Sequence, residues 1–259
     1  MLQAIIFDLD DTLLWDAKSV NEAFKVACEE AKEKYDLDAH ALENSVKEHA
    51  QSLYESYETY DFTKNIGIGT FEALWGDFQD EGESFRKLRE IAPTYRKDAW
   101  RKGLEEFGVE DEAFAKELAE AFRVARKKHV YLYEETLDVL DELKNDYKLL
   151  LLTNGSPDLQ RTKLKLSPEL VPYFEHIVIS GDFGSGKPDP AIFKHALHLL
   201  DVEADEALMV GDNLLTDILG ASRTGIDSVW INHDDKRPEE VTPTYEIKRL
   251  RELLSIVKK

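Results

Sequence analysis

Short apolar runs that do not alternate with polar residues define the fold class of this chain. Each run is rich in Ile, Val or Leu, and they lie at Gln3–Phe7, Lys148–Leu152, His176–Ser180, Ala207–Val210 and Ser228–Ile231. Such runs are typical of strands that are buried on both faces of a parallel sheet. Helical patterns separate the last four runs, at Ser156–Leu166, Pro190–Leu200 and Thr216–Thr224. This alternation predicts an α/β fold with a doubly wound parallel sheet.

The stretch between the first run and the second has a different character. From residue 16 to residue 129 apolar positions recur at helical spacing, with breaks at Asn65–Thr70, Gln79–Ser84 and Phe107–Asp111. A crossover between parallel strands needs a single helix, which Thr136–Leu143 can supply. The remaining helical patterns therefore predict a separate all-α domain at residues 16–129. It interrupts an α/β core that consists of residues 1–15 and 130–259.

Polar and ionisable side chains follow each of the first four apolar runs. In chain order these segments are Asp8-Leu9-Asp10-Asp11-Thr12, Thr153-Asn154-Gly155, Lys187-Pro188, and Gly211-Asp212-Asn213 with Asp217 shortly after it. The carboxyl ends of parallel strands meet at one edge of a sheet, and ligands bind there in open α/β folds. We therefore expect these side chains to form one functional site.

Asp8 and Asp10 are two residues apart at a strand end, so their side chains point the same way. Two close carboxylates repel each other unless a cation or a shared proton compensates. A turn and helix-capping role would explain Asp11 and Thr12 taken alone. Together with Asp212, however, Asp8 and Asp10 indicate a metal site. Oxygen ligands suit Mg²⁺, and the sequence shows no Cys/His cluster of the kind that binds zinc.

Two other motifs are incomplete. The segment Gly181–Lys187 satisfies most of a P-loop pattern, but Pro188 stands where a Ser or Thr should bind Mg²⁺. Asp8-x-Asp10 resembles the start of an EF-hand loop, but it follows a strand, and Leu13 replaces the required glycine. A nucleotide triphosphatase and a calcium sensor are therefore not indicated.

Charge and cysteine content limit the partners and the compartment. The chain has 259 residues, 53 acidic against 33 basic, and a formal net charge of -20. Such a surface repels nucleic acid polymers, although a local site can still attract a small anion. The lone Cys28 is expected to be a small buried hydrophobe, and one cysteine fits a reducing cytoplasm. Neither a signal peptide nor an apolar run long enough for a membrane span is found in the sequence.

The ordered set of polar strand ends resembles the haloacid dehalogenase-like hydrolase superfamily. Its motifs are Asp-x-Asp-x-Thr, a Thr or Ser that ends a strand, a Lys before a helix, and Gly-Asp-x-x-x-x-Asp. The matching residues are Asp8, Asp10 and Thr12, then Thr153, then Lys187, and finally Gly211, Asp212 and Asp217. The resemblance covers residues 1–15 and 130–259 and implies a Rossmann-like core. The size and position of the insert resemble the helical C1 cap of this family.

This resemblance implies a Mg²⁺-dependent phosphatase that forms an aspartyl-phosphate intermediate. Asp8 would attack the phosphorus, while Asp10 would protonate the leaving oxygen and later activate water. The groups that would bind Mg²⁺ are Asp8, the backbone carbonyl of Asp10, and Asp212. The groups that would hold the phosphoryl oxygens are Thr153, the amide of Asn154, and Lys187, with Asp217 and Asn213 in supporting positions.

Several alternatives share this core. Asp10 favours phosphoryl chemistry, because the dehalogenases of the family lack an acid there and a halide needs no proton. A phosphomutase, a 2-haloacid dehalogenase and a non-catalytic binding protein are the alternatives. The stretches Gly225–Asn232 and Pro243–Ile247 resemble a subgroup with cytosolic 5′-nucleotidases and N-acylneuraminate-9-phosphatase. We therefore expect a nucleotide or sugar phosphate as substrate, and a monomer or homodimer that binds neither nucleic acid polymers nor membranes.

Overall fold

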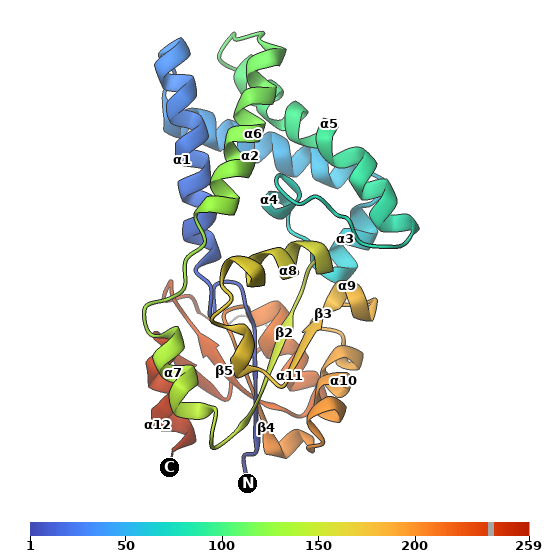
Figure 1. The fold of residues 1–259 in the computed structure, drawn as a ribbon, viewed down its shortest axis with the longest axis vertical. Helices are drawn as coiled ribbons and strands as arrows, with labels where there is room; N and C mark the ends of the chain where they lie inside the picture. Colours follow the sequence, from blue (N-terminus) through green and yellow to red (C-terminus); the bar gives the residue numbers. More distant parts are fainter. Residues whose placement is uncertain (238–240, 259) are drawn as a thin grey trace. The chain divides into compact units, whose positions relative to one another are not determined.

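The computed structural model describes residues 1–237 and 241–258. In this part of the chain, six parallel strands form one sheet in the order β3-β2-β1-β4-β5-β6 (Figure 1). The strands are β1 (Ala4–Phe7), β2 (Lys148–Thr153), β3 (His176–Ile179), β4 (Ala207–Gly211), β5 (Asp227–Ile231) and β6 (Tyr245–Ile247). The predicted α/β fold with a parallel sheet is confirmed.

The five apolar runs correspond to β1 through β5. Every residue of β1 and β4 is buried, as expected for central strands that are covered on both faces. The edge strand β6 was not predicted, because only Ile247 of its three residues is buried. It pairs with β5, where Ile231 is aligned with Ile247.

Helices cover both faces of the sheet. They are α7 (Thr136–Leu143), α9 (Ser180–Phe183), α10 (Pro190–Leu200), α11 (Leu219–Thr224) and α12 (Leu253–Val257), with a π-helical turn at Leu214–Ile218. Apolar side chains of α10 and α11 pack with those of the strands, and α7 and α12 lie on the opposite side (Figure 1). Asp189 accepts a hydrogen bond from the Ala191 amide and caps α10. Gly225 ends α11 at a φ of 76°, which favours glycine.

A second compact unit is all-helical. Its main helices are α1 (Asp16–Tyr35), α2 (Ala39–Ser56), α3 (Tyr60–Ile66), α4 (Thr70–Ala73), α5 (Glu83–Glu105), α6 (Glu112–Lys128) and α8 (Pro157–Leu166). The unit comprises residues Asp16–Val130 and Ser156–Leu166. The sequence had assigned residues 156–166 to the core, but the contacts of α8 group it with the inserted helices instead. The packing of Leu159 into the interior of the helical unit is part of the reason.

The interior of the helical unit is built from aromatic and small side chains. Phe24 packs against Phe122 and Trp100, with ring centroids 4.7 Å and 5.9 Å apart. Cys28 is buried in the same interior, and burial raises the pKa of its thiol to about 12. The thiol therefore stays protonated at neutral pH, which agrees with the prediction of a small buried hydrophobe.

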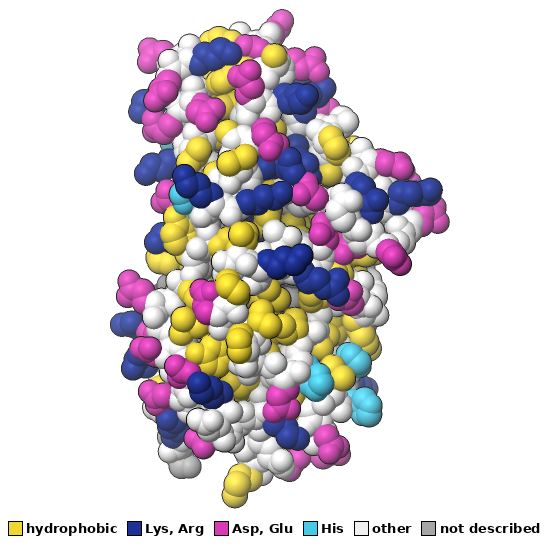
Figure 2. Space-filling view, in the orientation of Figure 1, with side chains coloured by type: hydrophobic (Ala, Val, Ile, Leu, Met, Phe, Trp, Pro, Cys, Tyr) yellow, Lys and Arg dark blue, Asp and Glu magenta, His cyan; other side chains and the backbone are white. Residues whose placement is uncertain are grey.

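Charged side chains of both signs are spread over the helical unit in the space-filling view (Figure 2). The runs Glu29–Lys34 and Glu110–Glu120 lie mostly on exposed helix faces, as their spacing predicts. Among the described residues, no helix is long and apolar enough to span a membrane.

Candidate active site

The order of the strands brings two of the polar strand ends together. β1 lies between β2 and β4, and Phe7 is aligned with Leu151 on one side and Val210 on the other. Asp8 follows β1, and its backbone N–H donates to the carbonyl of Val210 at 2.9 Å. Asp212 follows β4 directly. The first and fourth polar segments are therefore neighbours, in agreement with the expectation that the polar strand ends form one site.

A buried lysine contacts two of the candidate carboxylates. Lys187 Nζ lies 2.5 Å from Asp8 Oδ1 and 2.6 Å from Asp217 Oδ1. These side chains are almost completely shielded from solvent: Asp8 is 7 %, Lys187 5 % and Asp217 0 % exposed. Buried charges at this separation interact much more strongly than they would in water. The ion pairs therefore fix the orientation of Asp8 relative to Lys187.

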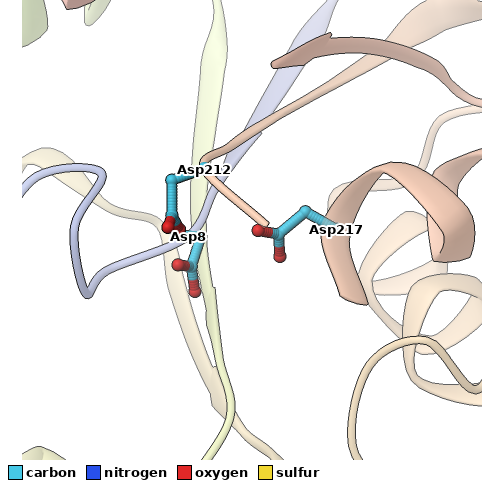
Figure 3. A group of neighbouring side chains, drawn as sticks. All are labelled: Asp8, Asp212 and Asp217. Atoms are coloured by element: carbon cyan, nitrogen blue, oxygen red, sulfur yellow. The ribbon is translucent and has the colours of Figure 1, made fainter. Parts of the chain in front are cut away.

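Three carboxylates converge at this position. Asp8, Asp212 and Asp217 each offer an oxygen atom, and these atoms lie within 4.8 Å of one another. Figure 3 shows the three side chains pointing toward a common region from the ends of β1 and β4 and from the turn after β4. A Cβ atom at Gly211 would overlap the carboxylate of Asp217, so the glycine leaves the space that Asp217 occupies.

The charges of this group shift its protonation equilibria. Burial, together with the charges of Asp8, Asp217 and Asp11, raises the pKa of Asp212 to about 9. Burial also raises the pKa of Asp8 to about 6, although Lys187 opposes the shift. Burial alone would lower the pKa of Lys187, but the charges of Asp217 and Asp8 outweigh it and raise that pKa. One lysine therefore does not neutralise three carboxylates.

The donor set fits a hard divalent cation. A cation at this position would offset both the burial and the like charges that raise the pKa of Asp212. Carboxylate oxygens are the ligands that Mg²⁺ prefers, and the converging group contains neither sulfur nor imidazole. The residues present at the site are thus compatible with Mg²⁺.

The segment after β2 is tied to the segment that carries Lys187. The side-chain amide of Asn154 donates to the Lys187 carbonyl at 3.0 Å, and its oxygen accepts from the Lys187 amide at 2.8 Å. Ser180 Oγ accepts from the Gly155 amide at 2.8 Å. These bonds hold the backbone after Thr153, a buried residue at the end of β2, in a defined position.

Asp10 and Asn213 lie in the turns that follow β1 and β4. Asp10 is half-buried and stands outside the group of three converging carboxylates. Asn213 Oδ1 accepts from the Leu215 amide at 2.9 Å and caps the π-helical turn. The backbone N–H of Asn213 donates to Asp217 Oδ2 at 3.1 Å, and this bond links the turn to the buried cluster.

Two residues near this site, Ser180 and Trp230, carry no functional signal in the sequence. Ser180 holds Gly155, as described above, and the Trp230 indole N–H donates to the Asp212 carbonyl at 2.8 Å. Both residues end or lie in apolar runs, so the sequence marks them only as strand residues. Their contacts depend on strand neighbours that are distant in the chain, and no local pattern could have identified them.

Comparisons with known proteins identify relatives of this chain. A phosphoserine phosphatase of Thermus thermophilus is 35% identical over 254 residues, which cover 97% of this chain and 98% of that protein. An N-acylneuraminate-9-phosphatase of Mus musculus is 34% identical over 164 residues, 62% of this chain and 66% of that protein.

The fold also matches a solved structure. The putative HAD-hydrolase YfnB of Bacillus subtilis, described as bound to magnesium, matches with a TM-score of 0.69 at 24% identity and covers 100% of this chain and 99% of its own. The family model that matches residues 2–225 describes a haloacid dehalogenase-like hydrolase. On the strength of the site, the fold and this match, the chain belongs to the haloacid dehalogenase-like hydrolases.

Proposed function

We propose that this hydrolase is a Mg²⁺-dependent phosphatase of small phosphomonoesters that forms a covalent intermediate on Asp8. The observation that carries the proposal is the contact of buried Lys187 with Asp8 within a group of three carboxylates. In this arrangement Asp8 is the nucleophile, the Lys187 ammonium group is a fixed positive charge, and the three carboxylates offer ligands to a metal cation. A phosphate monoester dianion can approach a carboxylate only where positive charge compensates the repulsion.

The residues would act in two steps. In the first, an Asp8 oxygen attacks phosphorus, the bond from phosphorus to the ester oxygen breaks, and Asp10 gives that oxygen a proton. In the second, Asp10 takes a proton from water, the water oxygen attacks phosphorus, and phosphate leaves with Asp8 restored. The phosphoryl oxygens would be held in both steps by the side chains of Lys187 and Thr153 and by the backbone amide of Asn154.

The cation would be held by Asp8, Asp212 and the backbone carbonyl of Asp10, with Asp217 beside it. When bound, Mg²⁺ supplies charge neutralisation at the transferring phosphoryl group. Asp217 and Asn213 would then have a supporting role. Their hydrogen bond keeps the turn after β4 closed against the cluster.

The substrate class rests on the relatives. The Thermus relative, which matches along nearly the whole chain, adds phosphoserine to the nucleotide and sugar phosphates that the sequence suggests. We further propose that the enzyme acts in the cytoplasm as a monomer or homodimer. The cap unit, residues 16–129, would supply contacts that select among these substrates.

The test is phosphate release from phosphoserine, nucleoside monophosphates and sugar phosphates, each with Mg²⁺ and with EDTA. We expect release that requires Mg²⁺ and that disappears in Asp8→Asn. Conversion of a sugar phosphate to its isomer without phosphate release would instead identify a phosphomutase. Halide release from a 2-haloacid would identify a dehalogenase.

A further inference from the structure

Trp230 makes a directed contact with the turn that carries Asp212. Trp230 lies on β5, where it is aligned with Gly211 of β4, and it is 2 % exposed. Its indole N–H donates to the backbone carbonyl of Asp212 at 2.8 Å. A buried indole N–H gains stability from an acceptor, and here the acceptor belongs to a residue of the carboxylate cluster.

The protein does not give every buried indole such a partner. The indole N–H groups of Trp75 and Trp100 are buried without an acceptor among the described residues. Both of these tryptophans serve as packing residues inside the helical unit. The bond from Trp230 to Asp212 is therefore a specific feature of the core, and the other two tryptophans provide controls that lack it.

The turn after β4 needs such a restraint. Asp212 faces the charges of Asp8, Asp217 and Asp11, all of which repel its carboxylate. Gly211 has no side chain that could anchor the start of the turn by packing. Hydrogen bonds hold the turn instead. The Asn213 backbone amide donates to Asp217 and the Leu215 amide donates to the Asn213 side chain, while the Trp230 indole holds the Asp212 carbonyl. Losing the bond from Trp230 would remove the restraint on the Asp212 carbonyl, while the bonds at Asn213 would remain.

We propose that Trp230 is a positioning residue for the divalent cation. By holding the Asp212 carbonyl, its indole N–H keeps the Asp212 carboxylate directed toward Asp8 and Asp217. The inference rests on the cation site of the proposed function but not on the identity of the substrate. Groups that orient metal ligands in this way commonly affect metal affinity strongly.

The experiment compares Mg²⁺ binding by calorimetry, without substrate, in the full-length protein and its variants. Trp230→Phe keeps an aromatic ring and removes the donor, and we expect its Mg²⁺ dissociation constant to rise about three- to tenfold. The half-saturating Mg²⁺ concentration for phosphate release should rise in parallel, with KM at saturating Mg²⁺ unchanged. The matched control, Trp100→Phe, should bind Mg²⁺ as the wild type does.

A second variant separates the hydrogen bond from packing and covers the case in which Trp230→Phe does not fold. Replacing Trp230 with 3-benzothienylalanine keeps the bicyclic ring and substitutes sulfur for the N–H group. A similar loss of Mg²⁺ affinity in this variant supports the proposal. Wild-type affinity in this variant, or no Mg²⁺ binding by the wild type, overturns it. Normal Mg²⁺ binding without release from any phosphomonoester would refute the proposed function and leave the role of Trp230 standing.

Discussion

Two clusters of buried and half-buried ionisable side chains, one in each unit, differ in their charge balance. The core cluster consists of Asp8, Lys187, Asp212 and Asp217, three acids and one base. The helical cluster consists of Asp16, Glu72, Arg126 and Lys163, two acids and two bases. In it Arg126 lies 2.6 Å from Asp16, and Lys163 lies 2.8 Å from Glu72 and 3.7 Å from Asp16.

The two clusters shift the pKa values of their carboxyl groups in opposite directions. Burial opposes ionisation in both places, but Lys163 and Arg126 outweigh it and lower the pKa of Asp16. In the core cluster burial and like charges act together, and the pKa of Asp212 rises to about 9. Burial alone therefore does not mark a functional site. A cluster of carboxylates that lacks a balancing charge is a candidate functional site, because it offers ligands to a cation.

The largest effect is expected from Asp8→Asn. An amide cannot attack phosphorus as the carboxylate does, so phosphate release at saturating Mg²⁺ should fall at least about a thousandfold. The matched variant in the helical cluster, Glu72→Gln, also replaces one buried carboxylate by an amide. Its activity per folded molecule should stay within about threefold of the wild type. If Asp8→Asn kept more than a few per cent of the activity, Asp8 would not be the nucleophile.

The core cluster could be predicted from the sequence because its residues follow apolar runs. Asp8 follows β1, and Asp212 and Asp217 follow β4. Parallel strands bring their carboxyl ends together for any sequence with this pattern. The short strand β6 gave no such signal. Its position depends on pairing with β5, which only the folded chain provides.

The helical cluster could not be predicted in this way. Lys163 and Lys165 are two lysines of the same helix, α8. Lys163 is buried, whereas Lys165 is exposed. Only contacts with Glu72 and Asp16, far away in the chain, distinguish them. The assignment of α8 to the core has the same explanation. A sequence shows the order of the elements along the chain, but it does not show which elements a helix packs against.

The next largest effect concerns stability. Lys163→Met leaves Glu72 and Asp16 with one cation between them, and we expect the free energy of unfolding to fall by about 3 kcal/mol. Urea unfolding in EDTA and in Mg²⁺ measures this loss, which Mg²⁺ should not restore. The control is Lys165→Met on the exposed side of the same helix, where a change below about 0.5 kcal/mol is expected. Equal losses in both variants would mean that the helical cluster adds no stability.

The pH dependence tests the imbalance of the core cluster. In the folded protein in EDTA, the pKa of Asp8 is raised to about 6 and the pKa of Asp212 to about 9. In the unfolded chain both groups lose their protons near the usual aspartate pKa of 3.8. Stability should therefore fall as pH rises from about 4 toward 9. Mg²⁺ binding requires those protons to leave, so Mg²⁺ affinity should increase with pH, by at most about tenfold per unit for each proton released.

The measurement is the difference in Tm between Mg²⁺ and EDTA at pH 6, 7, 8 and 9. We expect this difference to grow with pH. Asp16 does not contribute over this range, because its pKa is lowered and it stays ionised. A Mg²⁺ effect that is the same at every pH would show that the core carboxylates hold no extra protons.

The smallest effect is expected at Asp80, a carboxylate of the helical unit near the start of α8. Burial raises the pKa of Asp80, although hydrogen bonds from Ser156 and the Asp158 amide oppose the shift. Asp80 Oδ1 accepts from the Asp158 amide at 2.7 Å, and Asp80 Oδ2 accepts from the Ser156 hydroxyl, so the charge lies at the N-terminus of α8. Asp80→Asn keeps one acceptor and removes a charge that burial disfavours, so the free energy of unfolding should change by less than about 1 kcal/mol. Asp80→Ala loses both acceptors and should cost more. If the asparagine variant lost as much stability as the alanine variant, the charge of Asp80, and not its hydrogen bonds, would account for the stability that it gives to this helix terminus.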